Sequence, residues 1–375
     1  MNCRERFQAA MRFEDTDRTL LWDCGFWGGT MMRWYGEGLT RRKGLPDGLK
    51  WGTGVYGEDN ADVWDHFGLD PHRRRVPVET GLFPLFEERI LADHGRWGEV
   101  LGTDGIVRRE YKDKSALPHF VRGPVQSPED WERLKAERLR PDLGERANSD
   151  WPRWVRESQH RDYPVELSFQ GLWGFPRNLL GVEPLLLGFY DAPELIRDIV
   201  DTIVDFYIAL FGPILDEVDV DLAFFAEDLC YKNGPFAPPQ TIRDFLLPGY
   251  QKLTSFFRSH GVDIIALETD GDCRPLIPLF VEAGITALWP FEATSGQNIV
   301  EVRKQYPRLG IFGGLDKKAL IAGTREAIDA ELDVKVPFML ERGGYIPLLD
   351  HNASPDISWE SYTYYRRRLN EMVMG

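Results

Sequence analysis

Acidic side chains stand directly after an apolar run at residues 264–273, which read IIALETDGDC. The run ends in Glu268 and Asp270, and a glycine follows where the chain must turn. This pattern is typical of a buried parallel strand that carries carboxylates to its C-terminal edge. A second apolar run at residues 343–351, GGYIPLLDH, ends in a similar way with His351. We expect these two strand ends to form one site.

Glu268, Asp270 and His351 have the side chains of a metal site. Residues two apart on a strand point to the same face, so the two carboxylates can converge on one ion. Two carboxylates and an imidazole suit zinc, manganese or iron. We therefore predict a divalent metal, with zinc as the first choice, held by these three residues. Alternatively, residues 270–272 form a turn, in which Asp272 is the N-cap of the next helix.

Further acidic side chains follow other predicted strands. Glu227 ends the run LAFFAE and precedes Lys232, while Glu292 ends the run ALWPFE. A carboxylate beside a lysine at a strand end can hold a substrate or act as an acid–base pair, although a surface salt bridge has the same pattern. We predict that Glu227, Lys232 and Glu292 form the catalytic set that binds or protonates the substrate.

Four more residues are predicted to contact the substrate: Asp23, Arg177, Asp316 and Asp350. Asp316 follows two glycines that let the backbone approach a ligand closely, and Arg177 fits either an anion site or a solvated helix start. Together with the three glutamates above, Asp23 and Asp350 make five acidic strand ends. Facing carboxylates repel one another unless a cation lies among them, which favours a metal or a cationic substrate.

The elements that would position these residues alternate between strand and helix from about residue 163 onward. Apolar runs predict strands at residues 20–22, 165–169, 222–227, 264–270, 287–292, 309–313 and 344–349. Seven such strands approach the eight of an α/β (β/α)8 TIM barrel, whose active sites lie at the C-terminal ends of the strands. An open doubly wound sheet would require a glycine-rich phosphate loop after its first strand, and no such sequence occurs.

Residues 24–120 are predicted to form a lid and an insertion over the barrel mouth. Residues 26–70 are rich in glycine and tryptophan, so we expect irregular structure there. Residues 76–119 have the pattern of short strands with turns, which predicts a small antiparallel excursion. Because such segments cannot bury a core of their own, we expect residues 1–375 to form a single barrel domain.

The composition argues against several classes of function. The chain has 375 residues, 43% hydrophobic and 28% charged, and its formal charge is −15. Nucleic acids and anionic membranes require a basic surface, so neither is expected as a partner. We see no 18-residue apolar window and no secretory signal, and the four cysteines lack the spacing of a thiolate zinc site or a disulfide framework. A cytoplasmic location is expected.

The chain resembles a known family in four stretches, which are RERFQAAMRFEDTDR at residues 4–18, TDGDCRPLIPLFVEAGITALWPFE at 269–292, FGGLDKKAL at 312–320 and GGYIPLLDHNASPDISWESY at 343–362. The family is the uroporphyrinogen decarboxylase superfamily, and the chain is closest to its cobalamin- and coenzyme-M-type methyltransferase branch. The resemblance covers nearly the full length. It implies a (β/α)8 barrel, in agreement with the alternation of strands and helices.

The resemblance also bears on the site. The decarboxylases carry an Arg-Gln-x-Gly-Arg segment after the first strand, whereas residues 24–28 read CGFWG, without arginine. The methyltransferases hold zinc with His-x-Cys and a later Cys, and the resemblance places these ligands at Glu268, Asp270 and His351. Carboxylate ligands make a metal harder and favour oxygen donors, so we expect an oxygen-methyl or amine-methyl substrate in place of a thiol.

The function expected from these observations is metal-assisted methyl transfer that involves a small methylated substrate or a corrinoid carried by a partner protein. A decarboxylase of a uroporphyrinogen-like or other small carboxylic acid is the first alternative, and cationic walls in the pocket would favour it. A corrinoid- or tetrapyrrole-binding accessory protein is the second alternative, which a wide, apolar pocket would favour. A homodimer is a further expectation.

Overall fold

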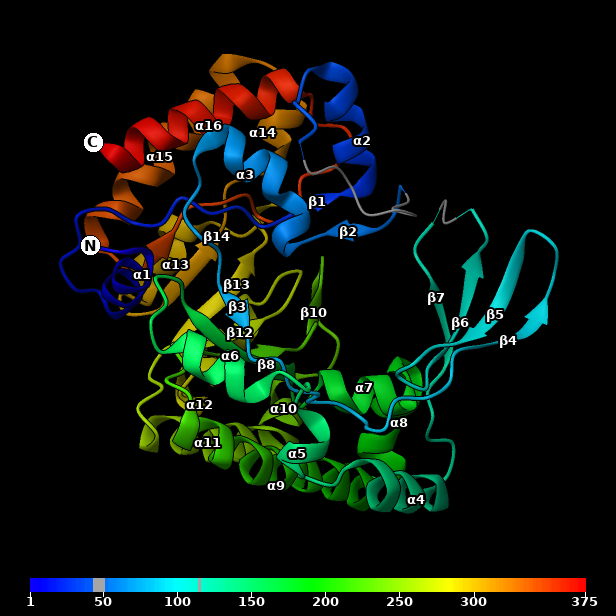
Figure 1. Cartoon of the computed structure of the whole chain (residues 1–375). Helices are drawn as coiled ribbons and strands as arrows, with labels where there is room; N and C mark the ends of the chain where they lie inside the picture. Colours follow the sequence, from blue (N-terminus) through cyan, green and yellow to red (C-terminus); the bar gives the residue numbers. More distant parts are fainter. Residues whose placement is uncertain (43–50, 114–115) are drawn as a thin grey trace.

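The computed structural model describes residues 1–42, 51–113 and 116–375, and at its centre lies a sheet of seven parallel strands (Figure 1). In spatial order the strands are β15 (Tyr345–Ile346), β14 (Gly310–Gly313), β13 (Ala287–Phe291), β12 (Ile265–Glu268), β9 (Leu222–Ala226), β8 (Val165–Gln170) and β3 (Arg74–Arg75). Each strand pairs in parallel with the next. The order from β8 to β15 follows the sequence, as expected of successive βα units in a barrel.

An extended segment at residues 19–22 lies between β15 at one edge of the sheet and Asp70, shortly before β3 at the other edge. Thr19 Oγ1 donates a hydrogen bond to the carbonyl of Tyr345 at 2.6 Å, and the N–H of Asp70 donates to the carbonyl of Leu21 at 3.1 Å. The N–H of Leu21 bonds to the Asp70 side chain at 2.8 Å and not to a neighbouring strand. The prediction of a strand at residues 20–22 is therefore wrong, although the segment is buried.

The fold is thus a curled seven-stranded α/β sheet of the TIM-barrel type. The predicted parallel architecture is confirmed, but eight paired strands are not present in the part of the chain that the structure describes. β3 comes from within residues 24–120, where no barrel strand was predicted. A strand was not predicted there because its two residues are arginines and form no apolar run. The pairing with Val165 and Glu166 of β8 makes the segment a strand.

Aromatic side chains fill the inside of the curled sheet. Phe224, Trp289 and Phe312 lie together there, and the ring centroids of Trp289 and Phe312 are 5.2 Å apart. Phe7 of helix α1 (Cys3–Arg12) packs against Phe312 from below. Helix α1 covers the N-terminal ends of the strands, because the N–H of Gly344 bonds to the carbonyl of Ala10 immediately before β15. The C-terminal ends of the strands, which α1 does not cover, are therefore the place to look for a site.

Helices cover the outside of the sheet (Figure 1). After β8 come α7 (Gly174–Leu180), α8 (Val182–Asp191) and α9 (Pro193–Glu217), and after β9 come α10 (Pro239–Phe245) and α11 (Leu247–Ser259). The later strands are followed by α12 (Ile277–Ala283), α13 (Ile299–Gln305), α14 (Lys317–Ile321), α15 (Arg325–Arg342) and α16 (Trp359–Met374). Before β8 lie α4 (Pro128–Arg138), α5 (Leu143–Arg146) and α6 (Trp151–Ser158). None of the described helices is long and apolar enough to cross a membrane.

The glycine- and tryptophan-rich region is more regular than predicted. It forms a two-stranded antiparallel sheet of β1 (Phe26–Trp27) and β2 (Gly54–Val55), together with helices α2 (Gly28–Glu37) and α3 (Ala61–Phe67). Helix α2 packs on α16, where Trp34 is fully buried against Tyr362. Irregular structure was expected because glycines interrupt the apolar pattern. The contact with α16, far away in the sequence, stabilises α2 instead.

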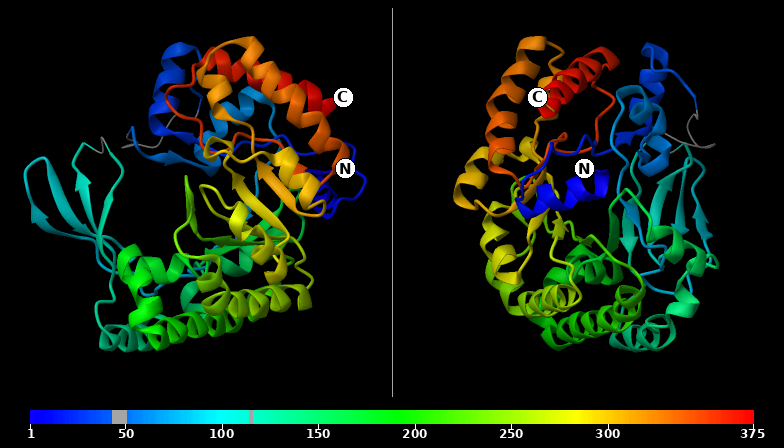
Figure 2. Two further views of the ribbon diagram at one scale, coloured as in Figure 1. Left: turned by 180° about the vertical axis from the view of Figure 1, so that it is seen from behind. Right: turned by 60° about the vertical axis from the view of Figure 1, so that its left-hand side comes forward.

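The predicted antiparallel excursion is a four-stranded sheet of β4 (Arg89–Asp93), β5 (Trp97–Leu101), β6 (Val107–Tyr111) and β7 (His119–Arg122). Figures 1 and 2 show it standing away from the helices that surround the parallel sheet. Many of its side chains are exposed on both faces. Among the described residues, its four strands supply none of the candidate metal ligands at the ends of the parallel strands.

Candidate functional site

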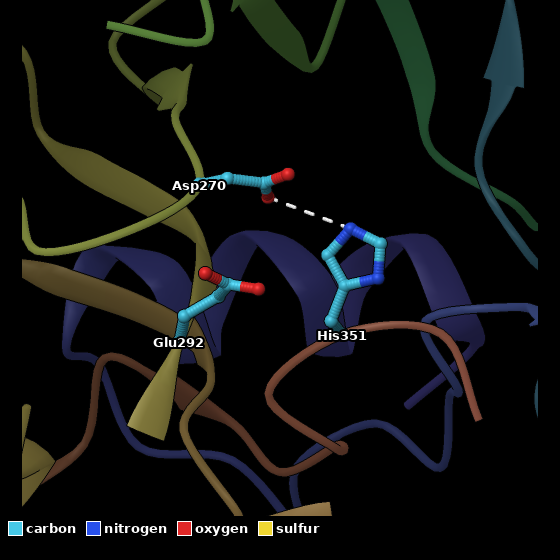
Figure 3. A group of neighbouring side chains, drawn as sticks. All are labelled: Asp270, Glu292 and His351. Carbon is cyan, nitrogen blue, oxygen red and sulfur yellow. Dashed lines mark ion pairs between the residues drawn. The ribbon is translucent and has the colours of Figure 1, made fainter. Parts of the chain in front are cut away.

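Asp270 lies at the centre of a group of acidic and imidazole side chains at the C-terminal ends of the strands. Ligand atoms of Asp270, Glu292 and His351 lie within 4.8 Å of one another. The same holds for Asp228, Glu268 and Asp270. Figure 3 shows the first three side chains converging, with Asp270 Oδ1 3.5 Å from His351 Nε2. The ends of four strands, β9, β12, β13 and β15, therefore meet at Asp270.

A tight turn after β12 presents Asp270. Gly271 in this turn has a φ of +74°, and a Cβ atom there would lie 2.4 Å from the backbone of Tyr231, so only glycine fits. The N–H of Gly271 donates a hydrogen bond to Glu292 Oε2 at 2.7 Å. This bond links the ends of β12 and β13 and holds Asp270 beside Glu292.

His351 reaches the same place from the loop after β15. Its Nδ1 accepts a hydrogen bond from the N–H of Asn352 at 2.7 Å, and the indole of Trp27 stacks on the imidazole with the ring centroids 6.5 Å apart. Nε2 is left facing Asp270. Burial disfavours the imidazolium, but the contact with Asp270 outweighs burial and raises the pKa of His351.

Asp228 and Glu268 lie on the other side of Asp270. Glu268 Oε2 accepts a hydrogen bond from the N–H of Glu227 at 3.1 Å, and burial raises the pKa of Glu268 well above its usual value, with further contributions from Asp228 and Asp270. Asp228 has a left-handed φ of 53° and forms an ion pair with Arg177 at 2.8 Å. Arg177, predicted to bind an anion, thus has a protein carboxylate as its partner.

The structure divides the predicted metal ligands between two groups that share Asp270. Glu268 belongs with Asp228, and His351 belongs with Glu292, so Glu268, Asp270 and His351 do not form one group. The sequence analysis missed Asp228 as a ligand candidate, although it directly follows Glu227. Only Glu227 was assigned a role at the end of this strand, and the turn after β9 brings Asp228 to the site.

The residues fit a divalent metal. Asp270 Oδ1 is buried and, apart from its ion-pair contact with His351 Nε2 at 3.5 Å, has no hydrogen-bond partner among the described residues, so it is available to a ligand. The carboxylates around it are hard oxygen donors that suit magnesium, manganese, iron or zinc. The imidazole of His351 fits with one adjustment. A metal on Nε2 places the ring proton on Nδ1, so the hydrogen bond from Asn352 must be given up.

Glu227, which was predicted to be catalytic, is bonded to the start of α7. Its carboxylate is buried, 1% exposed, and accepts hydrogen bonds from the N–H groups of Leu172, Trp173 and Gly174 at 2.7–2.8 Å and from the hydroxyl of Tyr250. These N–H groups lie at the start of α7. Burial raises the pKa of Glu227 to about 7, although the four donors oppose the rise. The carboxylate anchors this helix start and does not belong to either Asp270 group.

Three other predicted site residues also lie apart from the two groups. Lys232 is exposed in the turn between β10 (Cys230–Tyr231) and β11 (Gly234–Pro235). Asp316 is the N-cap of α14, because its side chain accepts a hydrogen bond from the N–H of Lys318 at 2.8 Å. Asp350 is fully buried and accepts a hydrogen bond from the N–H of Thr294 at 2.9 Å. Both aspartates organise loops at the mouth.

A cavity of about 500 Å³ is lined by residues that include Asp23, Cys24, Tyr56, Trp64, His72 and Arg73, and none of the five residues of the Asp270 groups belongs to this lining. The hydroxyl of Tyr56 accepts a hydrogen bond from Asn352, the neighbour of His351, at 2.6 Å. Burial raises the pKa of the Cys24 thiol, and the charges of Asp270 and Arg73 act on it in opposite directions. Cys24 thus lines the cavity near enough to Arg73 and Asp270 for the charges of both to act on its thiol.

Asp23 is the one predicted substrate contact that lines this cavity. Trp64 Nε1 donates a hydrogen bond to its Oδ2 at 3.0 Å, and burial raises the pKa of Asp23 to about 7. The unfolded chain ionises this carboxyl near pH 4, so the folded protein holds more protons between about pH 4 and pH 7. We expect the contribution of Asp23 to stability to fall as the pH rises through this window, by up to about 4 kcal/mol.

Urea denaturation of the unmodified protein and of Asp23→Asn across that pH range measures this effect. The expected result is that the difference in unfolding free energy between the two proteins shifts in favour of Asp23→Asn as the pH rises. A difference that stays constant with pH would show that Asp23 is ionised in the fold throughout.

Comparisons with known proteins agree with this architecture. No family model and no curated protein matches the chain. Among solved structures, the chain is similar to a methyltransferase from Methanosarcina mazei, with a TM-score of 0.64 and 16% identity over 99% of both chains. It also matches a B12-independent methionine synthase from Shewanella sp. W3-18-1, with a TM-score of 0.39 and 11% identity over 88% of this chain and 94% of that one. The first likeness establishes the fold, and at that level the resemblance found in the sequence is confirmed.

Proposed function

We propose that this protein is a methyltransferase that acts on a small methylated substrate at the Asp270 group with the help of a divalent metal. The observation that carries the proposal is the buried Oδ1 of Asp270, which lacks a hydrogen-bond partner among the described residues although three carboxylates and an imidazole lie around it. The likeness in fold to a methyltransferase over the whole length supports the reaction class.

In this proposal Asp270, Glu292 and His351 hold the metal. A divalent ion bound there supplies Lewis-acid polarisation of the oxygen or nitrogen that carries the methyl group. Asp228 and Glu268 lie on the far side of Asp270, where carboxylate oxygens would stabilise the positive charge that develops on a methyl carbon during transfer. The acceptor in the proposal is a corrinoid carried by a partner protein, as the resemblance implies.

One observation favours the decarboxylase alternative. Arg73 gives the cavity a cationic wall, which is the feature expected for a carboxylic acid substrate. The accessory-protein alternative has less support, because charged side chains, Arg73 and Glu166 among them, line the cavity.

The proposal is tested by loading the purified chain with zinc, manganese or cobalt and supplying free cob(I)alamin with small methyl ethers or methylamines. We expect the visible spectrum of methylcobalamin to develop with the loaded protein. The metal-stripped protein is expected to transfer methyl groups at least about a hundredfold more slowly, because metal polarisation contributes several kcal/mol. Release of carbon dioxide from an acid substrate without methyl transfer would overturn the proposal in favour of the decarboxylase.

A further inference from the structure

Arg73 presents an unsatisfied guanidinium in the wall of the cavity. Its side chain is 10% exposed, and its Cζ lies 4.3 Å and 5.2 Å from the ring centroids of Trp289 and Phe224. Nε donates a hydrogen bond to Glu166, but Nη1 is buried and has no partner among the described residues. A buried N–H group without an acceptor costs free energy, so an oxygen atom of a bound molecule would satisfy it.

The charges around Arg73 leave an excess of positive charge. Glu166 is 2% exposed and receives hydrogen bonds from two guanidinium groups, those of Arg73 and Arg75. Glu166 is shared with the solvated Arg75 and contacts only Nε of Arg73, so it compensates the buried guanidinium of Arg73 incompletely. Of the other acidic groups in the lining, Glu58 is exposed, and Asp23 accepts its hydrogen bond from Trp64.

We propose that Arg73 binds a carboxylate of the substrate, and that the methyl-bearing substrate is therefore a small organic acid. The substrate class rests on the proposed function, whereas the anion site does not. A single guanidinium that is already paired with Glu166 at Nε matches a monoanionic carboxylate better than a phosphate dianion, and a guanidinium edge fits carboxylate geometry. An acid held at Arg73 extends past Cys24 towards Asp270, where its methyl group would react.

The size and walls of the cavity set the shape of a suitable probe. A volume of about 500 Å³ accommodates a molecule built on one ring. The stacked rings of Trp64 and His72, with centroids 5.4 Å apart, form an aromatic part of the wall. The pair 4-methoxybenzoate and 4-methoxybenzamide meets these conditions, because the two molecules share one shape and differ in charge.

Isothermal titration calorimetry, in which each probe is titrated into the purified full-length chain, tests the anion site. We expect the benzoate to bind about ten- to a hundredfold more tightly than the benzamide, the range typical of a charge-assisted hydrogen bond. Arg73→Met should abolish this preference, and Arg73→Lys should restore part of it. Arg75→Met is the matched control: it removes the second partner of Glu166, but at 70% exposure its charge is screened, so the preference should change only a few-fold at most.

Equal binding of the two probes to the unmodified protein would overturn the anion site, and so would a folded Arg73→Met that keeps the preference. If Arg73→Met does not fold, the two probes on the unmodified protein and on Arg73→Lys give the answer. The methyl-transfer assay separates the two proposals. Charge-dependent binding without methyl transfer keeps the anion site and rejects the proposed function. Equal rates of transfer from both probes reject the acid substrate while methyl transfer stands.

Discussion

Asp270→Asn is expected to abolish metal binding, because Asp270 is the one residue common to both groups of candidate ligands. An amide lacks the negative charge and one of the oxygen atoms that a hard cation requires. We expect metal affinity to fall by at least about a hundredfold, since even residues that only support a ligand are worth ten- to a hundredfold. Cobalt titration followed by the visible spectrum, with elemental analysis after dialysis, measures the loss.

Asp272→Asn is the matched control for this variant. Asp272 lies two residues further along the same loop, but its carboxylate pairs with Arg274 at 2.7 Å and belongs to neither group. The Asp272→Asn variant should therefore bind as much metal as the unmodified protein. Metal binding in Asp270→Asn that equals that of the unmodified protein would contradict the metal site.

Single variants on each side of Asp270 identify which group holds the ion. Glu292→Gln and His351→Ala remove ligands of one group, whereas Asp228→Asn and Glu268→Gln remove ligands of the other. The proposed function predicts that the first pair loses metal and the second pair retains it. The opposite result would place the ion among three carboxylates and favour an oxygen-only site.

Glu227→Ala is expected to destabilise the protein by about 3–5 kcal/mol, because it leaves buried hydrogen-bond donors without an acceptor. The donors are the N–H groups of Leu172, Trp173 and Gly174 and the hydroxyl of Tyr250. Gln in place of Glu227 keeps the shape but turns one acceptor into a donor, so it should cost less, about 1–3 kcal/mol. Urea denaturation at neutral pH measures both values.

Glu183→Ala, an exposed glutamate at the start of α8, is the control and should change stability by less than about 0.5 kcal/mol. A Glu227→Ala protein as stable as the unmodified chain but inactive would contradict the structural role. Glu227 would then have to act on the substrate, as the sequence pattern suggested.

The sequence by itself determined the parallel strands and the place of the site. Apolar runs bounded by glycine and acids are local patterns, so they predicted the strands from β8 to β15 and the helices that follow them. They also brought Asp270 and His351 to the same end of the sheet, because parallel strands finish at a common edge. The two arginines of β3 carry no such pattern, and only pairing with β8 makes them a strand.

Only the tertiary structure decided which acidic strand ends face the mouth. Glu227, Asp228 and Glu268 have the same pattern in the sequence, an acid at the end of an apolar run. The carboxylate of Glu227 is bonded to the start of α7, because it accepts hydrogen bonds from N–H groups more than fifty residues away in the sequence. The Asp228 carboxylate lies near Asp270 instead. A strand sequence encodes burial through its periodicity, but the hydrogen-bond partners of a polar side chain come from distant segments. The role of each carboxylate therefore depends on the assembled fold.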